Sequence, residues 1–354
     1  MTLSLAPYTA VLLASYGGPN EPDDVLPFMR NATAGKGIPD ERLLEVSQHY
    51  MMFGGRSPIN ELNDALITAL QDELSRRGIE VPVVIGNRNW HPFHKETVGE
   101  LADAGHTRVL GLPTSAYHSY SSCRQYSEDF EKAMDDVDRR VVIDKVAPFA
   151  ETEGFVRANA DAAKDAVASL RAKLGEAKTR VLFVTHSIPD AMNEASGDGT
   201  PGSTYREQHL RVATAVADIV EEETGEALDW ELTYCSRSGP PHVPWLEPDA
   251  SDRIAELPAD GVAGAVLVPI GFLSDHMEVV YDLDTEAKAA AADAEIGFER
   301  AATAGTHHAF VSMLVDRLLE RAAVARGDAD ESTERAYLDA TPCCYARPVA
   351  VAAH

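Results

Sequence analysis

Short apolar runs alternate with amphipathic helical segments along almost the whole chain, and this alternation limits the possible fold more than any other feature. We expect buried strands at residues 9–15, 81–86, 108–112, 141–145, 181–184, 229–235, 262–270 and 297–300. We expect helices at residues 21–29, 40–52, 59–77, 95–104, 121–135, 156–174, 205–224, 251–257, 278–292 and 306–326. Strands separated by helices in this way form parallel sheets that helices cover on both faces. The pattern therefore predicts an α/β protein.

The chain is expected to cross from one α/β half into another near residues 148–155. Its 354 residues are enough for two such halves. We predict an N-terminal half at residues 1–150, a C-terminal half at residues 151–326 and a polar, flexible tail at residues 327–354. Ligands are expected in a cleft between the halves, where the loops after the strands meet.

The chain is strongly acidic, with 31 Lys and Arg against 57 Asp and Glu and a net charge of −26. This charge repels the phosphates of nucleic acid and argues against docking on anionic lipid. No apolar run approaches the ~20 residues of a transmembrane helix, and the N-terminus lacks the basic start of a signal peptide. The four cysteines do not resemble a disulfide framework. We therefore expect a cytoplasmic protein with no nucleic-acid partner and no transmembrane segment.

A histidine follows the strand expected from Val181 onward, in the sequence VLFVTHSIPD. Ligands of parallel α/β sheets bind beyond the carboxyl ends of the strands, and an imidazole exchanges protons near neutral pH. His186 is therefore a candidate for chemistry. The alternative is a buried histidine that a backbone carbonyl satisfies, and this strand alone does not decide between the two.

A row of carboxylates lies near the end of the last long apolar run. Helical spacing is expected to bring Asp275, Glu278 and Asp282 near one face, and Glu286 continues the row. Oxygen ligands in such a row suit the passage of a divalent cation. A solvated acidic face is the alternative, and composition alone favours it.

The loops after the strands also hold several aromatic side chains. They contain no nucleophile elbow, no phosphate-binding glycine loop and no closed set of Cys or His metal ligands. Aromatic side chains together with a base and a carboxylate suit a flat, apolar ligand on which protons are moved.

Several separated motifs resemble the ferrochelatase family in order and spacing, from about Ala10 to Leu319. They are YMMFGGRSPIN, SYSSCRQY, VTHSIPD, SRSGPPHVPWLEPD and PIGFLSDHMEVVYDLD. GNRNW and the SRSGPP…PWLEPD form are similar to the actinobacterial branch. The resemblance implies a chelatase-like fold with two Rossmann-like halves. It also implies a lyase that inserts Fe²⁺ into coproporphyrin III to give coproheme in heme b biosynthesis.

The resemblance assigns roles to individual residues. His186 and Glu278 match the family's active-site histidine and glutamate, as catalytic residues and metal ligands. The porphyrin is expected to contact Tyr16, Ser57 and Tyr126 and to pack on Trp90. Arginines that other members carry are absent at Thr33 and Ala34, so Arg30 or Lys36 is expected to replace them. Asp275, Asp282 and Glu286 form the expected metal path.

The resemblance further implies Fe²⁺ and a porphyrin as substrates and the next heme-pathway enzyme as a partner. Some actinobacterial members bind a [2Fe–2S] cluster through four cysteines. The loop at residues 193–203 lacks the internal cysteine, so we expect free thiols. Protoporphyrin IX as substrate, a non-catalytic porphyrin- or metal-binding protein and a cobalt chelatase remain as alternative functions.

Overall fold

The computed structural model describes residues 3–35, 37–239 and 242–338. Two parallel sheets of four strands each organise them. The first sheet has the order β2-β1-β3-β4, and the second has the order β6-β5-β7-β8. The strands are β1 Ala10–Ser15, β2 Val83–Asn87, β3 Arg108–Pro113, β4 Val142–Lys145, β5 Thr179–His186, β6 Trp230–Cys235, β7 Gly264–Val268 and β8 Gly297–Arg300. Every strand expected from the apolar runs is present.

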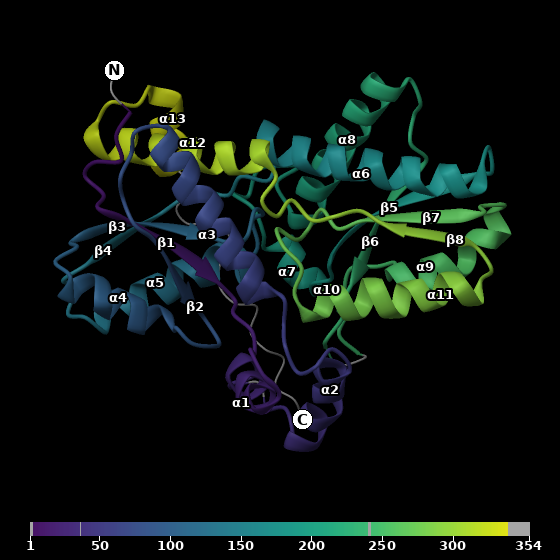
Figure 1. Cartoon of the computed structure of the whole chain (residues 1–354), viewed down its shortest axis with the longest axis horizontal. Helices are drawn as coiled ribbons and strands as arrows, with labels where there is room; N and C mark the ends of the chain where they lie inside the picture. The colour runs from purple at the N-terminus through teal and green to yellow at the C-terminus, as the bar shows by residue number, and fades with distance from the viewer. Residues whose placement is uncertain (1–2, 36, 240–241, 339–354) are drawn as a thin grey trace.

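Helices cover both faces of each sheet (Figure 1). Around the first sheet they are α3 Ile59–Arg76, α4 His94–Asp103, the π-helical turn η1 Tyr120–Arg124, α5 Gln125–Asp135 and, at the end of the chain, α12 His308–Arg326. Around the second sheet they are α6 Glu153–Leu174, α7 Asp190–Glu194, α8 Tyr205–Thr224, α9 Ala250–Glu256, the 3-10 turn η2 Leu257–Asp260 and the segment α10 Met277–Tyr281, η3 Asp282–Ala287 and α11 Lys288–Asp293.

The two sheets share one hydrophobic core. Apolar side chains of β1, such as Val11 and Leu13, belong to the same buried cluster as Val181 of β5 and Val266 of β7. Helix α12 strengthens this connection because it packs on both α3 and α6. The halves are therefore joined by buried apolar surface as well as by the chain.

Helices α1 Pro22–Ala32 and α2 Asp40–Met52 project from the first sheet below the rest of the molecule in Figure 1. They are built around a small separate core of Val25, Phe28, Met29 and Leu43. Their outer side exposes Leu44 and Met52. We call α1 and α2 the N-terminal hairpin.

The tail predicted from residue 327 contains a helix that the sequence analysis did not expect, α13 Glu331–Leu338. The carboxylate of Asp330 accepts hydrogen bonds from the Ser332 hydroxyl and from the Thr333 backbone N–H at 2.6 and 2.8 Å. Such a cap satisfies donors that a helix start leaves unpaired, which a reading of polarity alone does not register.

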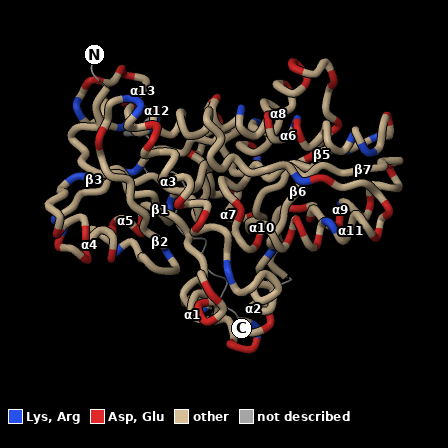
Figure 2. Tube along the Cα trace, in the orientation of Figure 1, with Lys and Arg blue, Asp and Glu red and all other residues tan. Residues whose placement is uncertain are grey.

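Acidic side chains are spread over both halves, with fewer basic side chains between them (Figure 2). Many of the basic side chains form ion pairs with them, as Arg253 does with Glu231 at 2.9 Å. Among the residues that the structure describes, none of the helices has the length and apolar character that crossing a bilayer requires.

Candidate active site

His186 is the last residue of β5, at the carboxyl end of the second sheet. Its Nδ1 lies 2.5 Å from the carbonyl oxygen of Ser187. A carbonyl oxygen only accepts, so Nδ1 carries the hydrogen and Nε2 of the neutral ring presents a lone pair. Nε2 lies 3.7 Å from Oε2 of Glu278. The alternative in the sequence analysis was a buried histidine whose ring a backbone carbonyl satisfies. The Ser187 carbonyl does bind the ring, but the imidazole is partly exposed and its other nitrogen faces the carboxylate of Glu278.

A buried network supports β5 behind His186. The Tyr205 hydroxyl donates to the carbonyl of His186 at 3.1 Å and lies 2.6 Å from Oγ1 of Thr185. Nε2 of His209 is 2.9 Å from the same Oγ1. Burial lowers the pKa of His209 to about 3, so its ring stays neutral. The ring of Tyr117, from the N-terminal half, stacks on His209 at 3.5 Å between centroids.

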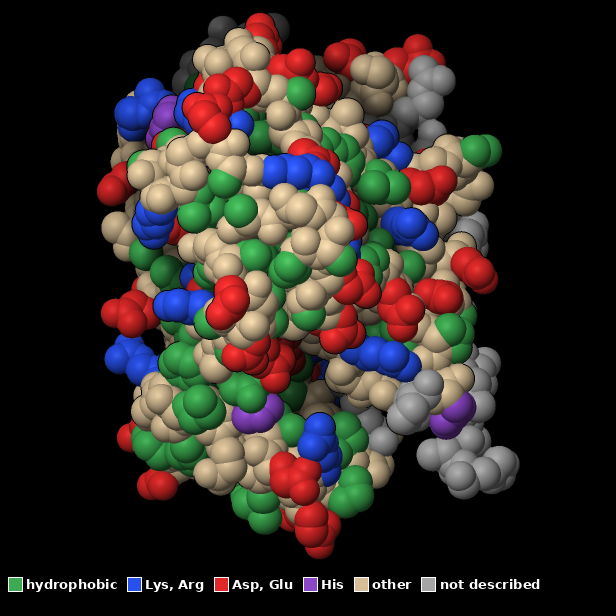
Figure 3. Space-filling view, turned by 90° about the vertical axis from the view of Figure 1, so that its right-hand side faces the viewer, with side chains coloured by type: hydrophobic (Ala, Val, Ile, Leu, Met, Phe, Trp, Pro, Cys, Tyr) green, Lys and Arg blue, Asp and Glu red, His purple; other side chains and the backbone are tan. Residues whose placement is uncertain are grey.

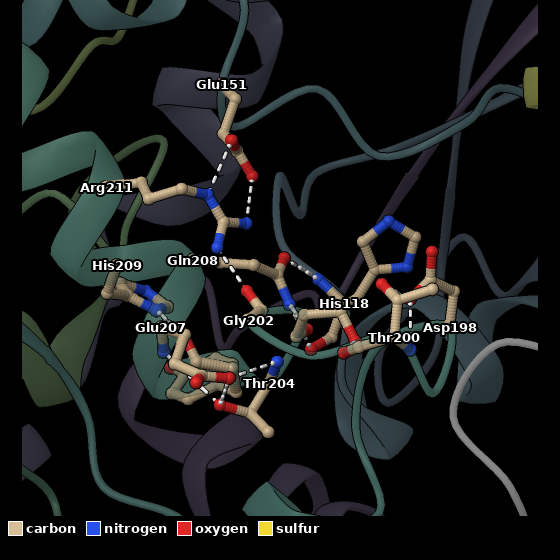
Figure 4. A network of polar contacts seen from close by, with 12 residues as sticks. His118, Glu151, Asp198, Thr200, Gly202, Thr204, Glu207, Gln208, His209 and Arg211 are labelled. Atoms are coloured by element: carbon tan, nitrogen blue, oxygen red, sulfur yellow. Dashed lines mark hydrogen bonds and ion pairs between the residues drawn. The ribbon is translucent and has the colours of Figure 1, made fainter.

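Figure 4 shows polar contacts of α8 beside this network, one of which connects the halves. The side-chain oxygen of Gln208 accepts from the backbone N–H of His118 at 2.9 Å, and its amide donates to the carbonyl of Ser203 at 2.8 Å. Arg211 pairs with Glu151 at 2.6 Å. The contact of Gln208 with His118 holds α8, which carries Tyr205 and His209, against the loop after β3 in the other half, and the contacts with Ser203 and Glu151 hold α8 within its own half.

Glu278 lies in the first turn of α10, and the helix continues as the π-helical segment η3. Single π-turns within helices are frequent at functional sites. Asp282 begins η3 and accepts a hydrogen bond from the Ser236 hydroxyl. Burial raises the pKa of Asp282 to about 6; the Ser236 hydrogen bond opposes this shift, and Glu278 and Glu286 add to it. Glu278 and Glu286 are exposed, and the half-buried Asp282 lies between them along the helix.

Figure 3 shows a recess between the body of the molecule and its lower part, which the N-terminal hairpin forms. Acidic side chains gather along the upper rim of this recess.

Asp275 does not lie on the helical face expected for it, and this prediction is wrong. α10 begins at Met277, so Asp275 precedes the helix. Its carboxylate receives two hydrogen bonds from Arg300, at 2.9 and 3.1 Å, and Asp284 binds the same guanidinium. The pair of carboxylates neutralises a partly buried cation, which the sequence spacing did not reveal.

Tyr16 follows β1 and lies at the inner side of the N-terminal hairpin. Its ring meets the edge of Phe28 at 6.1 Å between centroids. Although 38% of the Tyr16 residue is exposed, the protein around its phenol raises the pKa of that group by partial desolvation; Glu278 raises the pKa further, and Arg88 opposes the shift. Tyr50 of α2 responds in the same way, to burial first and then to Glu278 and Tyr16. Two phenols from the N-terminal half are therefore within electrostatic reach of Glu278.

Ser57 and Tyr126, the expected propionate contacts, are buried, with 3% and 4% of their surface exposed. Ser57 packs against Gly18, where an added Cβ would meet the Ser57 Cβ at 2.7 Å. The guanidinium carbon of Arg88 lies 4.3 Å from the centroid of the Tyr126 ring, and Nε of Arg88 pairs with Asp129 at 2.6 Å. Sequence reasoning missed Arg88, although a cation directly after a buried strand was a usable signal.

Trp90 packs its ring edge-on against Phe28, at 6.4 Å, as part of the hairpin core. Arg30 lies on the outer part of α1 and pairs with Asp40 at 2.6 Å, with about half of its side chain exposed. The porphyrin contacts of Trp90 and Arg30 stay predictions, and Lys36 lies outside the described residues.

A ring stack that the sequence did not reveal joins the N-terminal hairpin to the acidic helix. His49 of α2 lies over Tyr281 of α10, with centroids 3.7 Å apart and planes 6° from parallel. The hairpin thus reaches the element that carries Glu278, and residues from both halves surround the same site.

The described cysteines, Cys123 in η1 and Cys235 at the end of β6, are buried and lie in different halves. They do not fit a shared cluster. Cys343 and Cys344 lie outside the described residues, so the [2Fe–2S] prediction is not tested. Within the described ranges, no group of three or more His, Cys, Asp or Glu side chains is arranged to hold a metal ion.

Asp282→Asn is expected to raise the Tm by about 3 °C at pH 8 and to leave it unchanged at pH 4. The folded pKa of Asp282, about 6, lies above the ordinary 3.8, so the carboxyl group loses its favourable contribution as the pH rises through this interval. Thermal unfolding at both pH values tests this. Asp293→Asn, on the exposed side of α11, is the control and should shift the Tm by less than about 1 °C. An equal rise at pH 4 and pH 8 would contradict the prediction.

Comparison with known proteins identifies the family. A model described as ferrochelatase matches residues 8–322. A coproporphyrin III ferrochelatase of Leifsonia xyli subsp. xyli is 50% identical over 330 residues, which cover 89% of this chain and 84% of that protein. A coproporphyrin III ferrochelatase of Streptomyces griseus subsp. griseus is 46% identical, with 97% and 94% covered. A protein of Rhodopirellula baltica named ferrochelatase is 43% identical, with 90% and 87% covered.

Among solved structures, SirB from Bacillus subtilis with Fe³⁺ aligns with a TM-score of 0.50 at 14% identity, covering 91% of this chain and 98% of that one. Identity this low shows the fold alone, and the expected chelatase-like fold is confirmed. The family match spans most of the chain, and the motifs that carried the resemblance lie within it. This chain belongs to the ferrochelatase family.

Proposed function

We propose that this protein is a coproporphyrin III ferrochelatase, a lyase that inserts Fe²⁺ into coproporphyrin III and releases two protons, in heme b biosynthesis. The observation that carries the proposal is the identity of 41–50% to curated proteins named coproporphyrin III ferrochelatase, over most of the chain. The pairing of His186 and Glu278 at a sheet's carboxyl end supports it chemically.

Under this proposal, His186 accepts pyrrole protons. Its Nδ1 hydrogen is held by a carbonyl, which leaves Nε2 to act as the base. A positioned base typically contributes about 10²- to 10⁴-fold to a rate. Glu278 accepts the proton from Nε2 or takes part in holding the incoming ion, because its carboxylate lies beside the ring.

Tyr16, Trp90 and the buried Ser57 and Tyr126 are proposed to bind the porphyrin. Metal insertion requires four nitrogen lone pairs to face one ion, which a planar macrocycle does not allow. Bending the ring costs roughly 1–5 kcal/mol, which contacts away from the nitrogens can supply. The aromatic side chains around Phe28 provide a rigid apolar surface for this purpose.

Asp282 and Glu286 are proposed to lead Fe²⁺ toward Glu278. Carboxylate oxygens bind divalent cations, and the three residues follow one another along α10 and η3. Asp275 is left out of this path because Arg300 neutralises it.

The decisive test compares Fe²⁺ insertion into coproporphyrin III with insertion into protoporphyrin IX under anaerobic conditions. Coproporphyrin III has four carboxylates and protoporphyrin IX has two. We expect kcat/KM to favour coproporphyrin III by at least about tenfold, because hydrogen bonds to charged groups contribute strongly. A preference for protoporphyrin IX would contradict the proposed substrate. Porphyrin binding without insertion of iron would contradict the proposal that the protein is an enzyme. Cobalt insertion measured alongside separates a cobalt chelatase.

We also infer a cytoplasmic reaction, a division into halves at residues 1–150 and 151–326, and transfer of the product to the next heme-pathway enzyme. Transfer to the next enzyme is consistent with the chemistry of iron coproporphyrin, because its carboxylates remain available for a later reaction. Gel filtration of the two proteins mixed with iron coproporphyrin tests the transfer.

A further inference from the structure

Ser236 has an unusual backbone for a residue at the end of a strand. It follows Cys235, the last residue of β6, and its φ is 61°. Side chains other than glycine are disfavoured in this left-handed region, and bulky ones strongly so. Strained residues of this kind gather at functional sites, where the surrounding structure holds them in place.

The other described non-glycine residues with positive φ have an ordinary explanation. Asp138 and Arg139 lie in the turn after α5, and Glu295 lies just after α11. Helices commonly end in a left-handed residue because that geometry pairs their last carbonyls. Among the described non-glycine residues, Ser236 alone combines this backbone with a place beside the active site.

The strained backbone directs the Ser236 hydroxyl to the carboxylate of Asp282, which accepts its hydrogen bond. β6 lies beside β5, with Cys235 opposite His186 and with the Ser187 N–H donating to the Cys235 carbonyl at 2.8 Å. The hydroxyl thus connects the end of β6 to η3 next to the His186–Glu278 pair.

The carboxylate of Asp282 interacts electrostatically with both Glu278 and His186. Both Glu278 and His186 act on its carboxylate, the first raising its pKa and the second lowering it. A carboxylate near other acids is repelled by their charge, and a hydrogen-bond donor stabilises its ionised form. Ser236 is the donor that the structure shows for it.

We propose that Ser236 is a positioning residue for metal delivery, whose left-handed backbone holds its hydroxyl on Asp282 and fixes that carboxylate beside Glu278. The inference rests on the proposed function, since it concerns the route by which Fe²⁺ reaches the porphyrin. A glycine would adopt this backbone without strain but would leave Asp282 without its donor.

Three substitutions separate the hydroxyl from the backbone strain. Ser236→Gly and Ser236→Ala both remove the hydroxyl, but only alanine keeps a side chain in the strained region. Ser236→Asn tolerates this region and supplies an amide donor. We expect the KM for Fe²⁺ to rise at least about fivefold in the glycine and alanine variants and to return within about twofold of wild type in the asparagine variant.

The KM for coproporphyrin III should stay within about twofold of wild type in all three variants, because Asp282 is proposed to hold the metal and not the ring. The Tm of Ser236→Ala should lie about 1–3 °C below that of Ser236→Gly. Glu295→Gly is the matched control: it removes the same kind of strain far from the site, and both KM values should stay unchanged.

A double substitution shows whether Ser236 acts through Asp282. In Ser236→Gly with Asp282→Asn, the KM for Fe²⁺ should match that of Asp282→Asn alone, since residues that act as one unit are not additive. Additive effects, an unchanged KM for Fe²⁺ in Ser236→Gly, or an equal rise of the KM for the porphyrin would each overturn the proposal.

Calorimetric titration of Co²⁺ into the porphyrin-free protein gives a readout without turnover. We expect Ser236→Gly to weaken Co²⁺ binding at least about threefold relative to Glu295→Gly, and equal affinities would overturn the positioning role. If the wild-type protein fails to insert iron, the proposed function fails, and this titration still decides whether Ser236 supports a metal-binding carboxylate.

Discussion

His186→Ala is expected to lower kcat for iron insertion by about 10²- to 10⁴-fold while the protein stays folded. The imidazole is partly exposed and its ring contributes little to the core, so the Tm should change by less than about 2 °C. Insertion into coproporphyrin III is followed by the change in porphyrin absorbance. Porphyrin binding, followed by fluorescence quenching, should stay within about threefold of wild type because the aromatic contacts remain.

The matched control is His106→Ala, which removes a partly exposed histidine in the loop between α4 and β3, at the amino end of β3 and not at the carboxyl end of a strand. It should leave kcat within about twofold of wild type. Added imidazole should restore part of the activity of His186→Ala, since the cavity left by the side chain admits a free base. Activity within tenfold of wild type in His186→Ala would show that another group removes the protons.

Gly271→Ala is expected to lower the free energy of unfolding by about 1–3 kcal/mol and to lower kcat by about 10- to 100-fold. An added Cβ would meet Thr185 at 2.1 Å from Oγ1 and at 2.7 Å from Cα. The backbone N–H of Gly271 also donates to the Val184 carbonyl at 3.1 Å, so the two segments cannot easily separate. Thr185 directly precedes His186, and the collision therefore displaces the proposed base.

Gly99→Ala provides the comparison for Gly271→Ala. An added Cβ at Gly99, within α4, would meet nothing within 4 Å. Alanine is a better helix former than glycine, so this variant should gain roughly 0.5–1 kcal/mol and keep full activity. Urea unfolding and turnover of both variants test the pair. Gly271→Ala with wild-type activity would mean that the end of β5 moves without consequence for the reaction.

The fold was largely readable from the sequence because its strands are buried on both faces. Runs such as Val181–Val184 are continuous and apolar, and turn residues bound them, so each strand and most helices could be placed. Contacts between distant segments had no such signal. The stack of His49 on Tyr281 and the shared core of the two sheets depend on tertiary packing, which local periodicity does not encode.

The position of His186 at a strand end was readable from the sequence, and the family resemblance added Glu278, which the structure places 3.7 Å from it; their roles stay predictions. The position of a carboxylate was not predictable where a distant basic side chain pairs with it. Arg300 of β8 pairs with Asp275, and the spacing of residues near Asp275 gives no indication of a partner 25 residues further along the chain. The strained backbone of Ser236 also has no sequence signature, because serine at the end of a strand is ordinary.

The carbonyl of Ser187 has a stoichiometric consequence. With one ring nitrogen of His186 occupied by that carbonyl, a single lone pair faces the reaction, yet every turnover discharges two protons. Under the proposed roles, His186 therefore accepts the two pyrrole protons one after the other. Its imidazole has to lose the first proton before it can accept the second. Glu278, whose Oε2 lies 3.7 Å from Nε2 of His186, is the neighbour placed to accept the first proton from the imidazole. If this transfer is slow, the second deprotonation of the porphyrin becomes rate-limiting, and kcat shows a solvent isotope effect.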